Sequence, residues 1–500
     1  MVATDGTPGQ ARAPGEAGAP REVRAAGEVG GFTTVVGDRH SEVAPTLADT
    51  VPQSLGLTDQ MGLWGNLGVS LLGFTGAIGV LEPAGAVRLS LAAAITVTVV
   101  GTALGALALA VSGLPGARTG APAMVLLRGL FGARVSYLPT ALNIVQLMGW
   151  GTFELVTIAT AAHTVAPSMP RWLYVCIAGV LTVALTVRPL GAIRVLRRYV
   201  TVLVVVVLVY LFIELVGHPL SNHGSGSWSG FWTAMDNPVA VAVSFVPLAA
   251  DYTRHSRSGR AAFGGAFVGY GITQTACYVI GLVALVTVAR GPDDIYGAFI
   301  AVPLGSLAFA VLAARELDQS FANVYSTVVS VQNLRPLWDR RVLAVVIGVM
   351  TTCLALWANI GDYQSFLLLI GSVFVPLFAV LVVDFFVLSR GSWDTSTRAP
   401  ARRIMMAPWA LGFVTYQLIN PGGISWWVSA WTWVARGIHF APASWMSASI
   451  ASFLVAGAAT FVVGGAQTIA RRRAPAGGRS GRPGERRARR TAPAPVPGSG

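Results

Sequence analysis

The amino-acid sequence predicts an all-α membrane protein that crosses the lipid bilayer about twelve times. The chain is 54% hydrophobic and only 11% charged, whereas soluble domains usually carry about a quarter charged residues. Its mean hydropathy is +0.63, and apolar runs of about 20 residues, long enough to span a bilayer as a helix, recur through its middle. These runs do not alternate apolar with polar residues, so a transmembrane β-barrel is not expected.

The distribution of arginine orients the expected spans. With the N-terminus in the cytoplasm, seventeen arginines fall in cytoplasmic loops or at their helix ends, and the outer loops hold only Arg88, Arg171, Arg290 and Arg436. This asymmetry follows the positive-inside rule, and adding or removing one span would destroy it. We therefore expect a cell-membrane protein with both termini in the cytoplasm. The expected spans lie near residues 61–81, 87–112, 138–164, 172–187, 199–216, 237–252, 263–289, 301–328, 342–358, 363–388, 405–420 and 446–468.

Two polar tails flank the predicted core of residues 59–470. Residues 1–58 are rich in Gly, Pro and Ala and contain no apolar run, which predicts a disordered cytoplasmic tail without a signal peptide. Residues 471–500 hold nine arginines against one acid, Glu485, and this charge favours the anionic lipids of the inner leaflet. No aromatic residue in that tail could stack on a base, so no nucleic-acid partner is expected.

All 35 basic residues are arginine, which, with abundant Ala and Gly, indicates the GC-rich genome of a bacterium. Without lysine the chain can form neither a Walker phosphate-binding loop nor a Schiff base. Cys176, Cys277 and Cys353 each stand alone in an apolar run, and the six histidines are scattered, so disulfide and zinc sites are not expected. The sequence thus predicts no enzyme, no nucleotide-driven pump and no cofactor.

The third span carries a polar stripe at membrane depth. Asn143, Gln146, Trp150 and Glu154 follow one another at steps of three, four and four residues, which places them on one helical face. An indole beside an amide and a carboxyl suits a planar heterocycle, because the ring stacks while the polar groups bind its edges. The alternative is structural: Trp150 packs against a neighbouring helix and Glu154 pairs with a buried arginine.

The eighth span carries a second stripe, with three charged residues midway along an apolar stretch. Such charges are costly in a bilayer and usually mark a substrate or ion pathway. We expect Glu316 or Asp318 to change protonation or to bind Na⁺ during transport, although a structural Arg315–Asp318 pair is the alternative. The predicted polar face contains Glu316, Ser320, Asn323, Thr327 and Ser330, with Gln319 and Ser326 on its flank.

Helix-weakening residues occur in the first and sixth spans. Residues 64–79 of the first contain five glycines, Gly68 among them, and the sixth contains Pro238 and Pro247. Interrupted helices at matching positions of two five-span sets point to a binding site at the interface of an inverted repeat. The expected repeats cover about 61–216 and 237–388, followed by extra helices at about 405–468.

Four motifs make the sequence similar to a known family. They are GARTGAPAMVLLRGLFGARVSYLPTALN at 116–143, Gly149–Trp150, VPLAADYTR at 246–254, and the pair ANVYSTVVSVQNL and FLLLIGSVFVPLFAVLVVDFFVL in the eighth and tenth spans. Together they resemble the nucleobase–cation symport family of cytosine, purine, uracil, thiamine, allantoin and hydantoin permeases, and cytosine permease-like members most closely. The resemblance implies a five-plus-five inverted-repeat fold whose first, third, sixth and eighth helices hold the substrate.

Residue by residue, the resemblance implies that Trp150 stacks on the substrate and that Asn323 hydrogen-bonds it. Glu154 stands where family members often have an amide, and Phe245 stands near the position of a common tryptophan. Asp318 and Gln319 replace hydroxyl residues of sodium-coupled members, so the coupling ion can be Na⁺ or H⁺. At the end of the sixth span, Asp251 and Arg254 of the DYTR motif are expected to serve topology or gating, because an arginine there suits the helix C-terminus and the inner leaflet.

The expected function is import of a nucleobase or similar neutral heterocycle by cation-coupled symport with alternating access. Hydroxymethylpyrimidine, allantoin or hydantoin are the alternative substrates within the same fold. A membrane-bound enzyme would need a cluster of His, Cys or carboxylates near one membrane face, and a transporter-like sensor would need a folded cytoplasmic domain. The sequence indicates neither.

Overall fold

The computed structural model describes residues 52–187, 191–220, 226–291 and 294–473, and within these ranges it is helical, with two isolated β-bridges. The two predicted tails, apart from 52–58 and 471–473, lie outside the described residues. Residues 52–56 contact the core: Gln53 Nε2 donates to the Ala117 carbonyl over 2.9 Å, and Leu55 N donates to the His255 carbonyl over 2.9 Å. The first helix begins at Leu57, four residues before the predicted span.

Each of the twelve predicted spans coincides with a helix or an interrupted helix. The chain forms α1 (Leu57–Gly68), α2 (Leu71–Leu81), α3 (Leu91–Thr119), α5 (Tyr137–Val165), α6 (Arg171–Val187), α7 (Gly191–Val216), α8 (Phe231–Val243), η2 (Val246–Leu248), α9 (Ala249–Thr253), α10 (Gly259–Gly264), η3 (Gly265–Tyr270), α11 (Gly271–Thr287), α13 (Gly305–Leu334), α14 (Arg340–Trp357), η5 (Ile360–Asp362), α15 (Tyr363–Val382), η6 (Val383–Leu388), η7 (Arg403–Met405), α16 (Met406–Ile419) and α18 (Ala448–Arg473).

Length and composition make many of these helices able to cross a membrane. In the described ranges seven are long and apolar enough, or eight if α1 and α2 form one span, and α6 and residues 202–216 are shorter apolar helices. Helix α13 has 30 residues, which exceeds the length needed to cross a bilayer, but it carries the charged stripe that lowers its hydropathy.

The first span is interrupted as predicted. Helices α1 and α2 meet at an angle of 62°, and Val69 and Ser70 between them are extended. Ser70 starts the second half-helix by accepting the Leu72 backbone N–H on its hydroxyl, over 3.1 Å. Gly68 is needed at the bend because a Cβ there would lie 2.2 Å from Thr273 Oγ1.

The sixth span is interrupted too. Helix α8 ends at Val243, and the 3₁₀ turn η2 with Pro247 at its second position separates it from the short helix α9. Proline has no backbone N–H and cannot continue an α-helical hydrogen-bond ladder, which explains the break after Ser244. Pro238 lies inside α8 without ending it.

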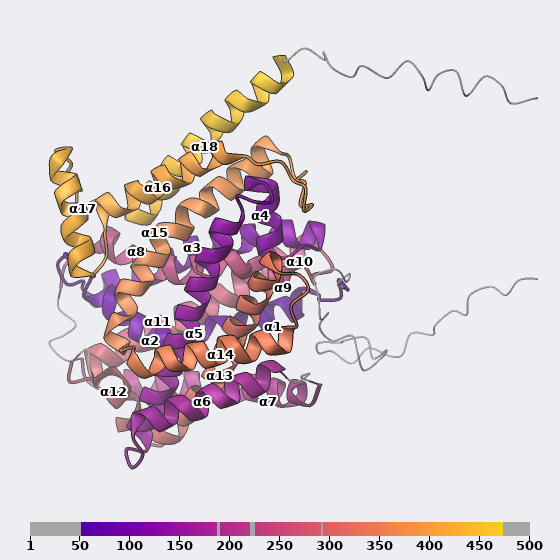
Figure 1. Ribbon diagram of the computed structural model, residues 1–500. Coiled ribbons are helices and arrows are strands. Elements are labelled where there is room, and N and C mark those ends of the chain that lie inside the picture. The colour runs from indigo at the N-terminus through magenta and orange to yellow at the C-terminus, as the bar shows by residue number, and fades with distance from the viewer. Residues whose placement is uncertain (1–51, 188–190, 221–225, 292–293, 474–500) are drawn as a thin grey trace, which may run out of the picture.

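Three short helices are absent from the prediction: α4 (Ala123–Phe131), α12 (Ile295–Ala301) and α17 (Ser425–Gly437). In Figure 1, α16, α17 and α18 lie at one side of the bundle and α6, α7 and α14 at another. Helices α16 and α18 pack on each other, and α18 also packs on α15. The Asp236 carboxylate of α8 joins this group to the core by accepting from the backbone of Ala448 over 3.0 Å and of Ser449 over 2.9 Å.

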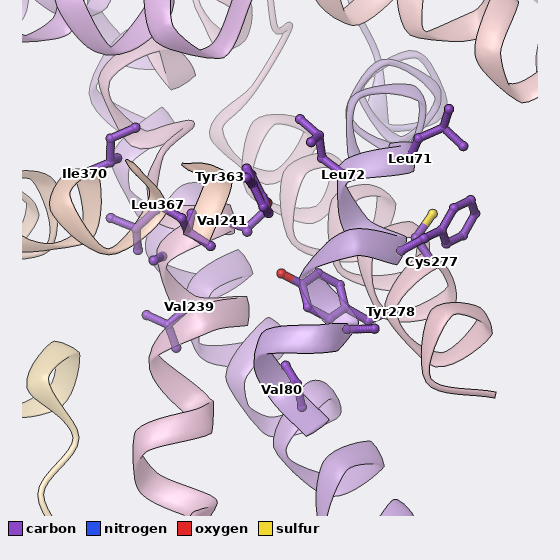
Figure 2. Close-up of a cluster of buried hydrophobic side chains, with 14 of the residues drawn as sticks. Leu71, Leu72, Val80, Val239, Val241, Cys277, Tyr278, Tyr363, Leu367 and Ile370 are labelled. Carbon is purple, nitrogen blue, oxygen red and sulfur yellow. The ribbon is translucent and has the colours of Figure 1, made fainter. Parts of the chain in front are cut away.

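The part of the core formed by α2, α8, α11 and α15 combines aliphatic side chains with buried tyrosines. Figure 2 shows Tyr278 of α11 and Tyr363 of α15 among aliphatic side chains of α2, α8 and α15. The Tyr278 hydroxyl donates to Asn237 Oδ1 over 2.6 Å, and Asn237 Nδ2 donates to Gln364 Oε1 over 2.9 Å. These hydrogen bonds connect α11, α8 and α15 to one another.

Candidate functional site

A small cavity of about 20 Å³ lies between the two helix breaks. Its wall is formed by residues of α1, α2, α5, α8, α11, α13 and α15. The turns η2 and η3 and the residues at the two helix breaks, Ser70, Ser244 and Phe245, complete it. Six residues predicted from the sequence line it: Gly68, Trp150, Glu154, Phe245, Gln319 and Asn323. The structure thus brings the polar faces of the third and eighth spans to the same place as the two interruptions.

Trp150 presents an aromatic surface and a free donor to this cavity. Its indole packs edge-to-face on Tyr363, with ring centroids 5.9 Å apart, and on Phe366, at 5.6 Å. These contacts fix the orientation of the ring. The buried Nε1–H has no hydrogen-bond acceptor among the described residues, and a buried donor usually has one. The indole is therefore placed to contact a ligand.

Two amides of α13 line the same cavity as Trp150. Gln319 Nε2 donates to the Leu67 carbonyl at the end of α1 over 2.9 Å, while its buried Oε1 receives no hydrogen bond. Asn323 lies one helical turn further along and lines the cavity with 7% of its surface exposed. One amide therefore holds the first-span break, and the other is available to a ligand.

The sixth and seventh spans complete the wall. Phe245, at the break after α8, packs on Tyr270 with ring centroids 5.1 Å apart. On α11, Gln274 Nε2 donates to Thr102 Oγ1 over 3.0 Å and to the Pro238 carbonyl over 2.9 Å, but its Oε1 is buried without a donor. The cavity thus contains a further unsatisfied acceptor.

Glu154 adds a carboxyl group to the same wall. It is 1% exposed, and its Oε2 has no donor. Glu316 of α13 is a second buried acid and accepts the Leu71 backbone N–H at the start of α2. Its Oε2 lies 4.0 Å from Nη1 of the Arg315 guanidinium. Arg315 Nε donates to Asn66 Oδ1 over 3.3 Å. The acids and the arginine are all buried between α5, α13 and the first-span break.

Three residues predicted to contact substrate or ion lie elsewhere. Gln146 is not in the cavity wall; its Nε2 donates to the Ser244 carbonyl over 2.9 Å and so holds the sixth-span break. Ser320 faces α6, where Thr182 Oγ1 donates to its hydroxyl over 3.0 Å. Asp318 is half-buried, two residues from Glu316 on another face of α13, and does not line the cavity. A polar stripe on a helix also serves helix packing, which explains these differences.

The DYTR residues lie outside the cavity. Asp251 Oδ1 accepts the Ala123 backbone N–H at the start of α4 over 2.9 Å, and its Oδ2 has no donor. Arg254 is the C-cap residue of α9, and its backbone carbonyl accepts from Gln53 Nε2 over 3.3 Å. Asp251 therefore connects the end of the sixth span to α4, and neither residue lines the cavity.

Sequence reasoning missed several wall residues: Ser70, Ser244, Tyr270, Gln274, Tyr278 and Tyr363. These residues lie in long apolar spans with no polar repeat to mark them, and only the tertiary fold turns them toward the cavity. No group of three His, Cys, Asp or Glu side chains within the described ranges is arranged to hold a metal ion.

Comparison with known proteins places this site in a family. The model of the family described as permeases for cytosine/purines, uracil, thiamine and allantoin matches residues 74–399. The chain belongs to this family. It is therefore a permease of small heterocyclic compounds and a multi-pass membrane protein, and it is not an enzyme. No curated protein sequence matches the chain significantly.

Solved structures show the same fold at low sequence identity. Mhp1, a nucleobase-cation-symport-1 family transporter, in a closed conformation with bromovinylhydantoin bound, is 17% identical with a TM-score of 0.64, over 85% of this chain and 96% of that one. Its inward-facing structure has the same identity and a TM-score of 0.63, over 86% and 96%. A manganese transporter from Eremococcus coleocola is 14% identical with a TM-score of 0.52, over 85% and 99%. The chain has the fold of these transporters.

Proposed function

We propose that this permease imports a nucleobase or a related neutral heterocycle by cation-coupled symport. The observation that carries the proposal is that Trp150 and Asn323, from two different helices, line one cavity between two interrupted helices. An indole face suits a flat ring, and stacking of a base on an aromatic side chain contributes about 1–3 kcal/mol. The amide can bind one edge of the ring with both a donor and an acceptor.

The unsatisfied polar atoms of the wall indicate the hydrogen-bonding pattern of the substrate. Within the described part of the chain, Trp150 Nε1 is a donor without an acceptor, whereas Gln319 Oε1 and Gln274 Oε1 are acceptors without donors. Glu154 Oε2 also has no donor. Leaving such atoms buried and unpaired costs about 1–3 kcal/mol each, so a substrate that pairs with them gains affinity. A ring with several N–H groups and a carbonyl or ring-nitrogen acceptor has this pattern, and cytosine, purines, allantoin and hydantoin-like rings all fit it.

Alternating access is supported by the placement of the breaks. Helices α1 and α2, and likewise α8 and α9, can change their relative angle at the cavity without breaking a continuous helical ladder. We assign the first five and the second five spans to two inverted repeats around this cavity, followed by α16 and α18. Asp251 and Arg254 act in this scheme as gating residues, because they lie at the end of the sixth span, where Asp251 joins α9 to α4.

The decisive experiment measures uptake into proteoliposomes. Purified protein is reconstituted, and radiolabelled cytosine, uracil, adenine, allantoin, hydantoin and hydroxymethylpyrimidine are each supplied with an inward Na⁺ gradient or an inward proton gradient, imposed separately. We expect one class of these rings to accumulate over protein-free liposomes under one of the gradients. If no ring is taken up or exchanged under either gradient, the proposed function is wrong.

A further inference from the structure

Two glutamates of different helices face each other beside the cavity. Helices α5 and α13 pack closely, since a Cβ on Gly151 would lie 3.9 Å from the Asn323 Cβ, and Glu154 and Glu316 of these helices are close enough to act on each other. Each is 1% exposed, and each has one buried oxygen that receives no hydrogen bond from the rest of the described protein. Two carboxylates carry no proton between them, so a hydrogen bond across this pair requires that one of the two be protonated.

The charges around the pair favour a single bound proton. Arg315 stands 4.0 Å from Glu316, also acts on Glu154, and is 2% exposed. With both glutamates ionised the three side chains would carry a net charge of −1 at membrane depth, whereas one proton makes the group neutral. An uncompensated buried charge is far more costly than a neutral group.

The other titratable groups that face the pair come from three more elements. They are Cys277 of α11, Tyr296 of α12 and Tyr363 of α15. A thiol and phenols ordinarily ionise above neutral pH, so they supply no charge that could replace the proton. The proton-binding capacity near pH 7 therefore belongs to the two carboxyl groups.

Two oxygen atoms at the first-span break that could bind a sodium ion already have donors. The Leu67 carbonyl accepts from Gln319 Nε2 over 2.9 Å, and Asn66 Oδ1 accepts from Arg315 Nε over 3.3 Å. Sodium ions in interrupted-helix transporters are bound by such unwound carbonyls. Here the Gln319 amide binds the Leu67 carbonyl and the Arg315 guanidinium binds Asn66 Oδ1. The positive charge of Arg315 also repels a cation placed beside these oxygens.

We propose that the coupling ion is a proton and that the Glu154–Glu316 pair carries it. This inference rests on the proposed function, because it assigns the ion of the same transport cycle. One proton enters from the outer side and forms the shared hydrogen bond; it leaves to the cytoplasm when the pair becomes fully ionised. Glu154 lines the substrate cavity, and Glu316 is bonded to the start of α2. Substrate binding and movement of α2 therefore both act on the proton.

The test uses the proton itself as the readout. Wild-type protein is reconstituted with the pH dye pyranine trapped inside, in a sodium-free choline medium, and the ring that is bound best in the uptake panel is added outside. We expect the lumen to acidify as the ring enters. An inward gradient of about one pH unit is expected to sustain at most about tenfold accumulation if one proton accompanies each substrate.

Matched variants locate the proton site. Glu154→Gln and Glu316→Gln keep the side-chain size, and the new amide oxygen in Glu316→Gln can still accept the Leu71 N–H, but neither variant can form the proton-sharing acid pair. We expect both to lose substrate-driven lumen acidification. Glu82→Gln, the same change at an exposed loop position, should acidify the lumen as wild type does.

The outcomes separate this inference from the proposed function. Accumulation of a ring that follows only the Na⁺ gradient, with no lumen acidification by the wild type, would overturn the proton assignment and leave the heterocycle permease intact. Acidification that persists in both glutamine variants would overturn the site. Failure of every ring to enter or exchange would instead overturn the proposed function. The wild-type measurement decides the coupling ion even if a variant fails to fold.

Discussion

The side-chain amide of Gln319 donates to the backbone carbonyl of Leu67 over 2.9 Å and so joins the eighth span to the end of the first half-helix. This carbonyl lies at the break, where no helical N–H can satisfy it. The eighth span thereby holds the interrupted helix beside the cavity. The same side chain lines the cavity, and its Oε1 has no donor among the described residues. A ligand that binds Gln319 would therefore also act on the helix break that Gln319 holds.

Removing this bond is expected to weaken substrate binding. Gln319→Ala leaves a buried acceptor unpaired, which costs about 1–3 kcal/mol, and it removes a cavity acceptor as well. We predict roughly a tenfold to hundredfold increase in Kd, measured by isothermal titration calorimetry. Gln417→Ala is the matched control, because Gln417 also makes a buried amide bond, to Ser372 over 2.9 Å, on α16. An equal loss of affinity in both variants would contradict the role of Gln319.

Asp236 is expected to contribute to stability rather than to transport. Its carboxylate accepts from Ser447 Oγ over 2.6 Å and from two backbone N–H groups at the start of α18. Losing a helix cap costs about 0.5–2 kcal/mol, so Asp236→Ala should lower the thermal unfolding midpoint in detergent without changing the Kd. Asp294→Ala, at a helix start without a side-chain cap bond, should lower it less. Equal shifts would show that the cap is not the stabilising feature.

Asp251 is expected to affect the rate of transport. Its carboxylate accepts the Ala123 N–H at the start of α4, outside the cavity wall and next to the end of the sixth span. We predict that Asp251→Ala lowers the maximal uptake rate by about tenfold, the size of a coupling of about 1–3 kcal/mol, and leaves the Kd unchanged. Asp251→Asn retains an acceptor and should lose less. A changed Kd with an unchanged rate would refute the gating role.

His255, in the loop after α9, is expected to make stability depend on pH. Burial, and next the charge of Arg254, lower the pKa of His255 to about 4, from an ordinary value near 6.5. Between these values the unfolded chain binds a proton that the folded protein does not, so the free energy of unfolding falls as the pH is lowered through this window, by at most about 3 kcal/mol.

The check is the thermal unfolding midpoint in detergent at several pH values between about 4 and 7. His255→Gln removes the titrating group and should flatten the decline of the midpoint with falling pH. His218→Gln, at an exposed position, should leave the decline as in the wild type. If His255→Gln shows the full wild-type slope, His255 is not the group responsible.

The spans and both breaks could be predicted because they depend on local properties. The length of an apolar run predicts a span, and glycine and proline weaken the helix in which they stand. The helical period alone predicted that Trp150 and Glu154 lie on one face. The same period could not tell which polar residues of a stripe face the cavity. Gln146 holds the Ser244 carbonyl and Ser320 bonds Thr182, because their partners come from distant spans. Gln274 was missed for the same reason.

The most direct test of the heterocycle site compares the Kd of the ring that is bound best for two pairs of variants. Trp150→Ala removes the stacking surface, and Asn323→Ala removes an amide that lines the same cavity. Trp426→Ala and Asn359→Ala make the same changes at exposed positions. The account predicts binding weakened by roughly tenfold to hundredfold in the first pair and wild-type binding in the second. Wild-type affinity in both Trp150→Ala and Asn323→Ala would contradict it.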